Sequence, residues 1–271
     1  MHLSPPMVSP DPLVDPGSSL AVAMPSTSVE AIHPDHPPHL SLRSLTAAGR
    51  SSVVPVSAQF SPRLTSLVYP LGRHVVMPFY FGAIEVTGRE NLLHCHGPLI
   101  LAPTHRSRWD ALMVPYAAGY DIIGQHLRFM VSADEVTGLQ GWLIRRMGGF
   151  PINTNRPAIA SLRYGVDLLQ KGEVLVIFPE GDIFRDKIIQ PLKPGLARLA
   201  LQAEASQANL GIQIVPMHLD YSQPLVPWRC RVKVQIGQPL RVADYDLASP
   251  KHAAQQLTED LQQALHTLNI P

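Results

Sequence analysis

The sequence predicts an α/β fold in which helices flank a mainly parallel central sheet. Three observations favour this class. Strand-like segments alternate with helical segments from about residue 61 onwards. The two central strand candidates, residues 99–102 and 174–178, are apolar throughout, as strands covered on both faces are. Proline and glycine bound the helical segments, just inside the start and just past the end.

The first 55 residues have a different composition from the rest of the chain. They hold 10 of the 27 prolines and many serines, but few aromatic residues. Such a segment cannot bury enough apolar surface to offset the entropy of ordering it. We therefore expect residues 1–55 to be a disordered tail. A signal peptide is not expected, because no basic residue precedes the first apolar stretch.

Residues 56–271 are expected to form one folded domain, in which residues 56–83 are a helical lead-in close to a membrane. The apolar and aromatic segment 64–81 predicts one or two short helices. The elements expected after it are strands at 84–86, 99–102 and 129–131, and helices at 107–118 and 139–147, the last closed by Gly148 and Gly149.

The second half of the domain continues the alternation. A helix with its first turn at Pro157 and its end at Gly172 carries an apolar stripe. The strictly alternating segment 231–236 predicts an edge strand or a half-exposed one. The other expected elements are a strand at 174–178, a helix at 194–205, a strand at 212–217, and a last helix from Pro250 with Ala253, Leu257, Leu261 and Leu265 on one face.

Two short motifs directly follow the two apolar strands. The first contains His105 and, five positions later, Asp110. The second is Phe-Pro-Glu-Gly at residues 178–181. Open α/β sheets bind ligands at the carboxyl ends of their strands, which is where both motifs would lie. The His-x4-Asp spacing alone is weak in a chain with 12 histidines, so the pairing of the two motifs carries the prediction of a site.

These two motifs resemble the signature sequences of the 1-acylglycerol-3-phosphate acyltransferase family. Two further segments, 148–153 and 214–217, resemble the family's second and fourth sequence boxes in the expected order. The resemblance covers roughly residues 81–240. It implies a glycerol-3-phosphate acyltransferase-like fold, and it assigns Glu180 and Gly181 to holding the acceptor substrate.

The chain departs from the family pattern in two places. The second box usually closes on an arginine, but here Thr154 follows Asn153 and the nearest arginine is Arg156. The third box usually continues Gly-Thr-Arg, but here Asp182 follows Gly181. Both changes touch the region that the family uses for the polar head of the acceptor. They bear on the identity of the acceptor more than on the reaction.

The residue types of the first motif suit acyl transfer from a thioester. A histidine, with an ordinary pKa near 6.5, can take the proton of the attacking hydroxyl. His105 is therefore the expected general base. Five residues on a regular helix would leave Asp110 about 140° away from it. The chain must turn at His105 and then start a helix, so that Asp110 orients the ring as in a serine hydrolase triad.

The acceptor side of the site needs cations if the acceptor carries a phosphate. Glu180 would repel a phosphate, so we expect it to accept hydrogen bonds from hydroxyls or to orient a nearby arginine. Arginine offers a bidentate fork to phosphate. The candidate cations near the motifs are Arg108, Arg156, Arg185 and Lys193.

Composition excludes several other functions. The net charge of +1 and the lack of a basic stripe argue against nucleic acid. No cluster has metal-ligand spacing, and two cysteines form no disulfide framework. No segment approaches the about 20 apolar residues of a membrane span. Aromatic and basic residues gather in two patches, one with Trp142, Arg145 and Arg146 and the other with Phe79, Phe81 and Arg73. The expected membrane contact is therefore peripheral, at the cytoplasmic face.

Together these observations predict a phospholipid-synthesis acyltransferase, with no metal and no cofactor beyond its acyl donor. The donor would be a thioester of acyl carrier protein or coenzyme A, the favoured acceptor lysophosphatidic acid, and the product phosphatidic acid. Three alternatives remain open at this stage: another lysolipid acceptor, a thioester hydrolase that uses His105 on water, and a catalytically silent lipid-binding protein on the same fold.

Overall fold

The structure is a computed structural model that describes residues 56–153, 158–207 and 209–269. The expected tail, residues 1–55, and Arg156 lie outside these described residues. The strands are β1 (Ala83–Thr87), β2 (Leu99–Pro103), β3 (Leu127–Ser132), β4 (Gly149–Ile152), β5 (Val174–Val176), β6 (Gln213–Tyr221), β7 (Arg231–Ile236) and β8 (Leu240–Arg241).

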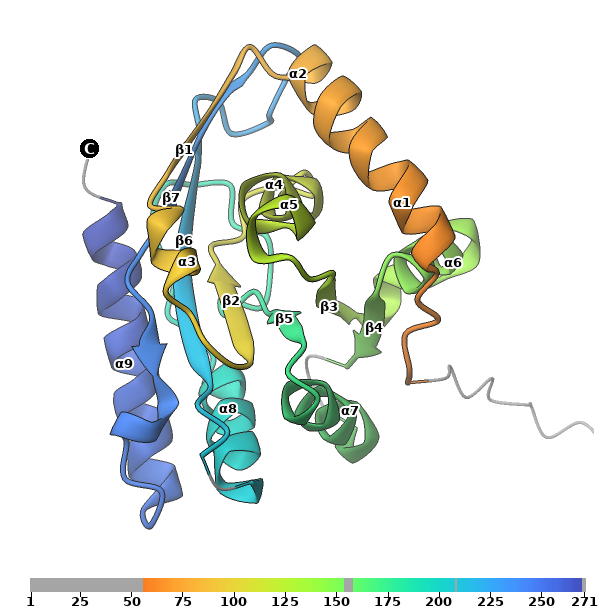
Figure 1. The fold of residues 1–271 in the computed structure, drawn as a ribbon. Coiled ribbons are helices and arrows are strands. Elements are labelled where there is room, and N and C mark those ends of the chain that lie inside the picture. The colour runs from red at the N-terminus through yellow and green to blue at the C-terminus, as the bar shows by residue number, and fades with distance from the viewer. Residues whose placement is uncertain (1–55, 154–157, 208, 270–271) are drawn as a thin grey trace, which may run out of the picture. The chain divides into compact units, whose positions relative to one another are not determined.

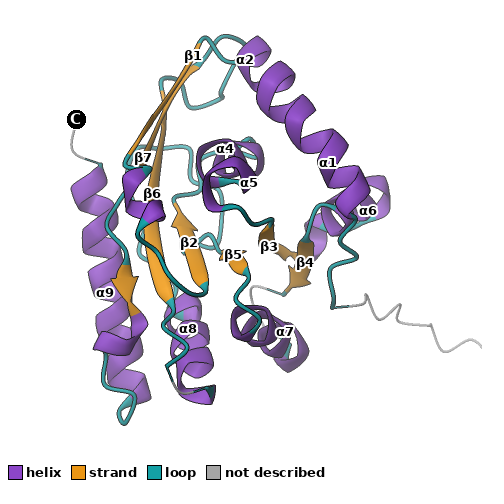
Figure 2. Ribbon diagram, viewed as in Figure 1, coloured by secondary structure: helices purple, strands orange, loops and turns teal. Residues whose placement is uncertain are grey.

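Helices alternate with these strands, as Figure 2 shows. The α-helices are α1 (Pro62–Leu71), α2 (Met77–Tyr80), α3 (Glu90–Leu93), α4 (Asp110–Ala118), α5 (Tyr120–Ile123), α6 (Gly138–Arg146), α7 (Ile159–Gln170), α8 (Gly195–Ser206) and α9 (Pro250–Leu268). A π-helical turn, η1 (Gly72–Val76), joins α1 to α2, and two 3₁₀ turns are η2 (Ala133–Glu135) and η3 (Val242–Asp244).

The eight strands form one sheet in the order β1-β7-β6-β2-β5-β3-β4, with β8 beside β6 (Figure 1). Every pairing is parallel except β6 with β7 and β6 with β8. The expected fold class, a mainly parallel sheet flanked by helices, is therefore confirmed. The register pairs Leu101 with both Val176 and Val215, so the carboxyl ends of β2, β5 and β6 point the same way, with β6 continuing past the other two to Tyr221.

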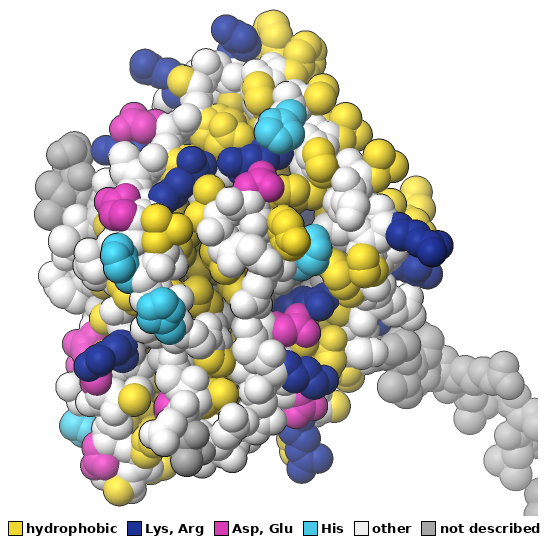
Figure 3. All heavy atoms as spheres, in the orientation of Figure 1, with side chains coloured by type: hydrophobic (Ala, Val, Ile, Leu, Met, Phe, Trp, Pro, Cys, Tyr) yellow, Lys and Arg dark blue, Asp and Glu magenta, His cyan; other side chains and the backbone are white. Residues whose placement is uncertain are grey.

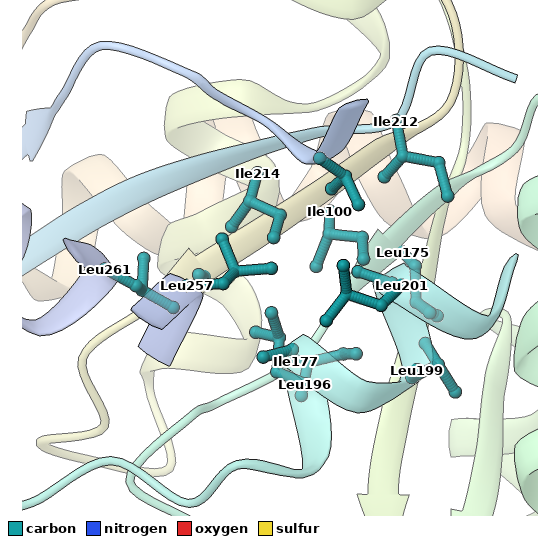
Figure 4. Close-up of a cluster of buried hydrophobic side chains, with 14 of the residues drawn as sticks. Ile100, Leu175, Ile177, Leu196, Leu199, Leu201, Ile212, Ile214, Leu257 and Leu261 are labelled. Atoms are coloured by element: carbon teal, nitrogen blue, oxygen red, sulfur yellow. The ribbon is translucent and has the colours of Figure 1, made fainter. Parts of the chain in front are cut away.

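Alternating side chains of the central strands build a core on each face of the sheet. Ile100 and Leu175 point into a cluster closed by α7, α8 and α9, part of which Figure 4 shows. Leu101 and Val176 point into the cluster on the other face, which α4 and the segment from Met77 to Phe81 cover. This double cover explains why β2 and β5 are apolar at every position.

Most of the expected elements are present, and the differences have local causes. The strand expected at 174–178 ends at Val176, because Pro179 has no N–H to donate to a neighbouring strand. The helix expected from residue 107 begins at Asp110, after a turn. β7 is half-exposed as expected, but it lies between β1 and β6 and is not an edge strand. β4 was not expected.

Candidate active site

The candidate site lies where β2, β5 and β6 end. His105 follows β2 by two residues, and Asp110 is the first residue of α4. Phe178 and Glu180 lie in the loop after β5, and Tyr221 is the last residue of β6. Parallel pairing of the three strands brings together side chains that are up to 116 positions apart in the sequence, from residue 105 to residue 221.

His105 and Asp110 form a hydrogen-bonded pair. Nδ1 of His105 lies 2.9 Å from Oδ2 of Asp110. The imidazole is 19% exposed, whereas the carboxylate is fully buried. The chain turns after His105 and starts α4 at Asp110, which is the arrangement predicted from the five-residue spacing. In the described part of the chain Nε2 has no hydrogen-bond partner, so it is the nitrogen available to a substrate.

Asp110 is held by four donors. Besides His105, Oδ2 accepts the backbone N–H of Arg106 at 2.6 Å and that of Ser107 at 2.8 Å. Oδ1 accepts the hydroxyl of Tyr221 at 2.6 Å. Burial and the neighbouring carboxylate raise the pKa of Tyr221 well above its usual value, so this hydroxyl stays protonated and donates. The carboxylate is thereby fixed in one orientation beneath the imidazole.

Glu180 joins the two motifs through Arg106. Its Oε2 accepts the backbone N–H of His105 at 2.8 Å, and Oε1 accepts that of Gln190 at 3.0 Å. Nη1 of Arg106 lies 3.0 Å from both carboxylate oxygens. Both side chains are buried. Glu180 is therefore in contact with an arginine, and its roles in orienting that arginine and in binding substrate stay predictions.

Arg106 also donates hydrogen bonds to two backbone carbonyl oxygens. Its guanidinium donates to the carbonyl oxygens of Phe184 at 3.2 Å and Ile188 at 3.4 Å. It therefore anchors the loop after β5 to the turn that carries His105. The arginine and the glutamate fix the relative position of the two motifs.

Gly181 makes a turn that other residues would strain. Its φ of +75° lies in the left-handed region that favours glycine. A Cβ at this position would lie 2.6 Å from Nζ of Lys193. The structure therefore brings Lys193, one of the predicted cations, directly against the second motif. Whether this pair holds the acceptor stays a prediction.

The other predicted cations occupy separate positions. Arg108 is exposed and forms a bidentate ion pair with Glu135, at 3.0 and 2.7 Å. Arg185 is exposed and lines a small hollow together with Arg106 and His218. The structure does not place Arg108 and Arg185 in contact with Lys193. Their binding roles stay predictions.

Phe178 covers one face of the predicted base. Its ring stacks on the imidazole of His105 with centroids 4.0 Å apart and an angle of 21° between the planes. This contact shields the face from water and restricts rotation of the imidazole. Together with Asp110 it holds the ring in one plane.

The sequence did not reveal three residues that build the site. Arg106 lies inside the first motif, but nothing in the sequence distinguishes it from a solvated arginine. Tyr221 lies 40 positions after the second motif, and Gln190 contributes only its backbone N–H, which no side-chain pattern marks. For Tyr221 a signal existed: it ends the strand whose start, residues 214–217, resembles the fourth sequence box of the family.

A second histidine near the site, His218, is buried. It is 2% exposed, and within the described residues its Nδ1 has no hydrogen-bond partner. Burial is the largest cause that lowers its pKa to about 4, and the positive charge of Arg106 adds to the effect. His218 therefore stays neutral near pH 7.

Known proteins of one family are similar to this chain. Residues 83–220, which are 138 of the 271 residues, match the protein-family model described as Acyltransferase. The chain is 24% identical over 188 residues to the 1-acyl-sn-glycerol-3-phosphate acyltransferase of Bacillus subtilis, a match that covers 69% of this chain and 88% of the relative. It is 27% identical over 151 residues to the protein of the same name from Streptococcus pneumoniae, covering 54% of this chain and 51% of that relative.

A solved structure has a similar fold. The 1-acyl-sn-glycerophosphate acyltransferase of Thermotoga maritima superposes with a TM-score of 0.52 over 73% of this chain and 80% of that one. The identity is 16%, so this similarity bears on the fold alone.

Proposed function

The chain belongs to the acyltransferase family, and from this we propose that it moves a fatty acyl group from a thioester to the free hydroxyl of lysophosphatidic acid, giving phosphatidic acid. The names of the two bacterial relatives support this choice of acceptor. The proposed donor is a thioester of acyl carrier protein or of coenzyme A, since both present the same carbonyl to the site.

One observation carries the proposal: the hydrogen bond between Nδ1 of His105 and Asp110. It fixes the proton on Nδ1 and leaves the lone pair on Nε2 to accept the proton of the acceptor hydroxyl. Histidine is suited to this step because its ordinary pKa is near neutrality, and a positioned base contributes roughly 10²–10⁴-fold in rate.

The proposed reaction needs no acyl-enzyme. As Nε2 takes the proton, the hydroxyl oxygen forms a bond to the thioester carbonyl carbon, and the carbonyl π electrons move onto its oxygen. The tetrahedral intermediate then expels the thiolate as the carbon–sulfur bond breaks. The imidazolium returns its proton to the sulfur. Asp110 stabilises the imidazolium while it exists, as the carboxylate of a serine hydrolase triad does.

The proposed membrane contact is supported by an exposed apolar ridge. Figure 3 shows hydrophobic side chains along the edge of the molecule where α1 and α2 run. The side chains that form the ridge are spaced four residues apart along α1, η1 and α2, and are Leu67, Leu71, Val75 and Phe79. Their exposed fractions run from 52% to 72%. A soluble protein rarely exposes such a continuous stripe without a partner.

Two tryptophans lie near the ends of this ridge. Trp142 on α6 is exposed, with the guanidinium of Arg146 over its ring at 5.5 Å. The backbone N–H of Ser61, just before α1, donates to the backbone carbonyl oxygen of Arg146. Trp228 is exposed and donates its indole N–H to the carbonyl oxygen of Phe79. Exposed tryptophan beside arginine suits the headgroup region of a bilayer. Among the described residues, none of the helices has both the length and the apolar character for a membrane crossing.

The sequence patches expected at this surface are corrected in part. Phe81 and Arg145 are buried, so they cannot contact a membrane. Arg73 donates to the carbonyl oxygen of Tyr116 and pairs with Asp121. The apolar ridge, which includes Phe79, and the separate Trp142 on α6 remain exposed.

The test of the proposed function is a product assay with labelled acyl donor, with and without lysophosphatidic acid, read by mass spectrometry. We expect phosphatidic acid from the parent protein. His105→Ala should lower turnover by at least about 100-fold while thermal stability changes little. His252→Ala, at an exposed position on α9, is the matched control. Free fatty acid as the only product would indicate a hydrolase, and no turnover with any acceptor would indicate a silent lipid-binding protein.

A second assay tests the acceptor. We propose that Arg156, two positions after Thr154, supplies the charge that the second box lacks at Thr154, while Arg185 and Lys193 approach from the second motif. A charge-assisted hydrogen bond is worth roughly 1.5–3 kcal/mol. Arg156→Ala should therefore raise the acceptor KM about tenfold or more and leave the donor KM nearly unchanged. Arg156→Lys should restore it only in part. An unchanged acceptor KM would move the phosphate site to Arg185.

A further inference from the structure

The hydroxyl of Tyr221 is placed to act on the predicted base through Asp110. Tyr221 is 5% exposed, and its hydroxyl donates to Oδ1 of Asp110 at 2.6 Å. Oδ2 of the same carboxylate holds Nδ1 of His105 at 2.9 Å. The three side chains thus form one chain of hydrogen bonds from β6 through α4 to the turn after β2.

Simple core packing does not account for this tyrosine. Its ring belongs to the apolar cluster with Phe81, whose centroid lies 6.2 Å away. A phenylalanine would fill the same space without a polar atom to satisfy. A buried tyrosine hydroxyl needs a partner, and here that partner is the buried carboxylate beside the predicted base. In the described part of the chain it is the only hydrogen bond to Oδ1.

We propose that Tyr221 is a positioning residue for acyl transfer. Its hydroxyl fixes the Asp110 carboxylate and partly offsets the negative charge of that group. In this way it sets the orientation and the basicity of His105. This inference rests on the proposed function, in which His105 is the general base. Without the hydroxyl, the carboxylate loses a restraint on rotation about its Cβ–Cγ bond. Its negative charge is also less shared, so it stabilises the imidazolium more strongly.

The other ionisable groups around the chain of hydrogen bonds come from four elements. Arg106 and Glu180 lie in the loops after β2 and β5 and are paired with each other. Cys230, just before β7, lies near enough to Tyr221 to contribute to its raised pKa. On β6, Asp220 is paired with Lys187, and His218 stays neutral. Among the described residues, Asp110 accepts hydrogen bonds from His105, from two backbone amides and from the Tyr221 hydroxyl. The ionisable groups named above do not bond to it directly.

The test is the pH dependence of kcat/KM for Tyr221→Phe. The base must be neutral to act, so the acidic limb of the profile reports its protonation. Removing the donor should move this limb to higher pH by about half to one unit, the equivalent of one hydrogen bond. Loss of orientation should lower kcat on the plateau about tenfold. The acceptor KM should stay within about twofold, because Tyr221 contacts neither substrate.

Tyr245→Phe is the matched control. The hydroxyl of Tyr245 also donates to an aspartate, Asp260, at 2.8 Å. Asp260 lies on α9, away from the site. Its removal should leave the pH profile at the parental position. If Tyr221→Phe lowers only the melting temperature and leaves the acidic limb where it is, the tyrosine is structural and the inference is wrong.

A graded probe covers the case in which Tyr221→Phe does not fold. Difluorotyrosine introduced at position 221 keeps the ring and makes the hydroxyl a stronger donor. The acidic limb should then move to lower pH, opposite to the phenylalanine variant; an unmoved limb overturns the inference. His105→Ala in the same assay separates the two claims. An active His105→Ala protein refutes the proposed base, whereas an inactive one with a parental Tyr221→Phe profile refutes this inference alone.

Discussion

At the scale of single residues, the site depends on two buried carboxylates that each accept several hydrogen bonds. Glu180 accepts from Arg106 and from two backbone amides, and Asp110 accepts from four donors. Burying a charge without such partners is very costly. The hydrogen bonds therefore have to form as a set, and the loss of one partner leaves the other uncompensated.

The Arg106–Glu180 pair provides a stability test. Glu180→Gln should lower the free energy of unfolding by about 3–5 kcal/mol, because Arg106 keeps a buried charge without its counter-ion. Turnover should fall with it, since the turn carrying His105 loses its restraint. Urea unfolding and the product assay measure the two effects. Glu135→Gln, which breaks the exposed pair with Arg108, is the control and should cost less than about 1 kcal/mol.

His218 gives the protein a predicted acid sensitivity. Its pKa is lowered from 6.5 to about 4 in the folded state, so the unfolded chain binds a proton first as the pH falls. This contribution to stability is complete above pH 6.5 and is lost on acidification toward pH 4. His218→Gln should therefore lose roughly 2–3 kcal/mol less than the parent between pH 7 and 4.5. Urea unfolding at both values measures this, with the exposed His252→Gln as control; equal losses in His218→Gln and the parent would contradict it.

The core of the site could be predicted at this scale, but its supports could not. The five-residue spacing predicted both the turn and the bond between His105 and Asp110, because the sequence separation itself excludes a shared helix face. Arg106 looks like a solvated charge in the sequence, since burial depends on a partner 74 positions away. Tyr221 meets Asp110 only through the alignment of β6 with β2.

At the scale of elements, predictions held where a segment's own pattern decides its structure. The stripe on α9 is buried as expected, and the apolar strands β2 and β5 are central. β4 was missed because Gly149 and Pro151 are depleted in strands. It pairs with β3 alone, and such an edge position is where a strand tolerates proline.

The apolar ridge on α1, η1 and α2 yields a prediction about membrane binding. Burying the exposed ring of Phe79 in a bilayer would contribute about 1.5–3 kcal/mol. Phe79→Ser should therefore weaken binding to vesicles of neutral and anionic phospholipid by about tenfold or more, as measured by sedimentation. Leu247→Ser, at an exposed apolar position outside the ridge, should bind like the parent. Equal binding of all three proteins would show that the ridge does not contact lipid.

At the scale of the whole molecule, the parallel register of β2, β5 and β6 assembles the site from distant segments. Each of these strands ends in a loop or residue that contributes to the site: His105, Glu180 and Tyr221. Behind these residues, helices cover apolar side chains on both faces of the sheet. The predicted site residues therefore lie together at the carboxyl ends of the central strands.

The described residues form a sheet and the helices that cover both its faces. This arrangement predicts the effect of removing residues 1–55. A chain that begins at Val56 retains every described strand and both hydrophobic clusters. It also retains Ser57, whose carbonyl oxygen accepts from Arg145, and Ala58, whose N–H donates to Tyr164. We expect it to fold and to keep its specific activity, as judged by thermal melting and the product assay. Loss of soluble folded protein would show that residues 1–55 are needed for folding.

The benzene ring of Phe178 also makes His105 observable by magnetic resonance. Protons above an aromatic face are shielded by its ring current, so the imidazole protons of His105 should resonate upfield of most of the 12 histidines. His126, which stacks on Tyr120 at 4.7 Å, should be shielded too, and Phe178→Leu assigns the signals by moving only one of them. Following the assigned resonance against pH would then report the protonation of the proposed base in the resting protein, before any substrate is added.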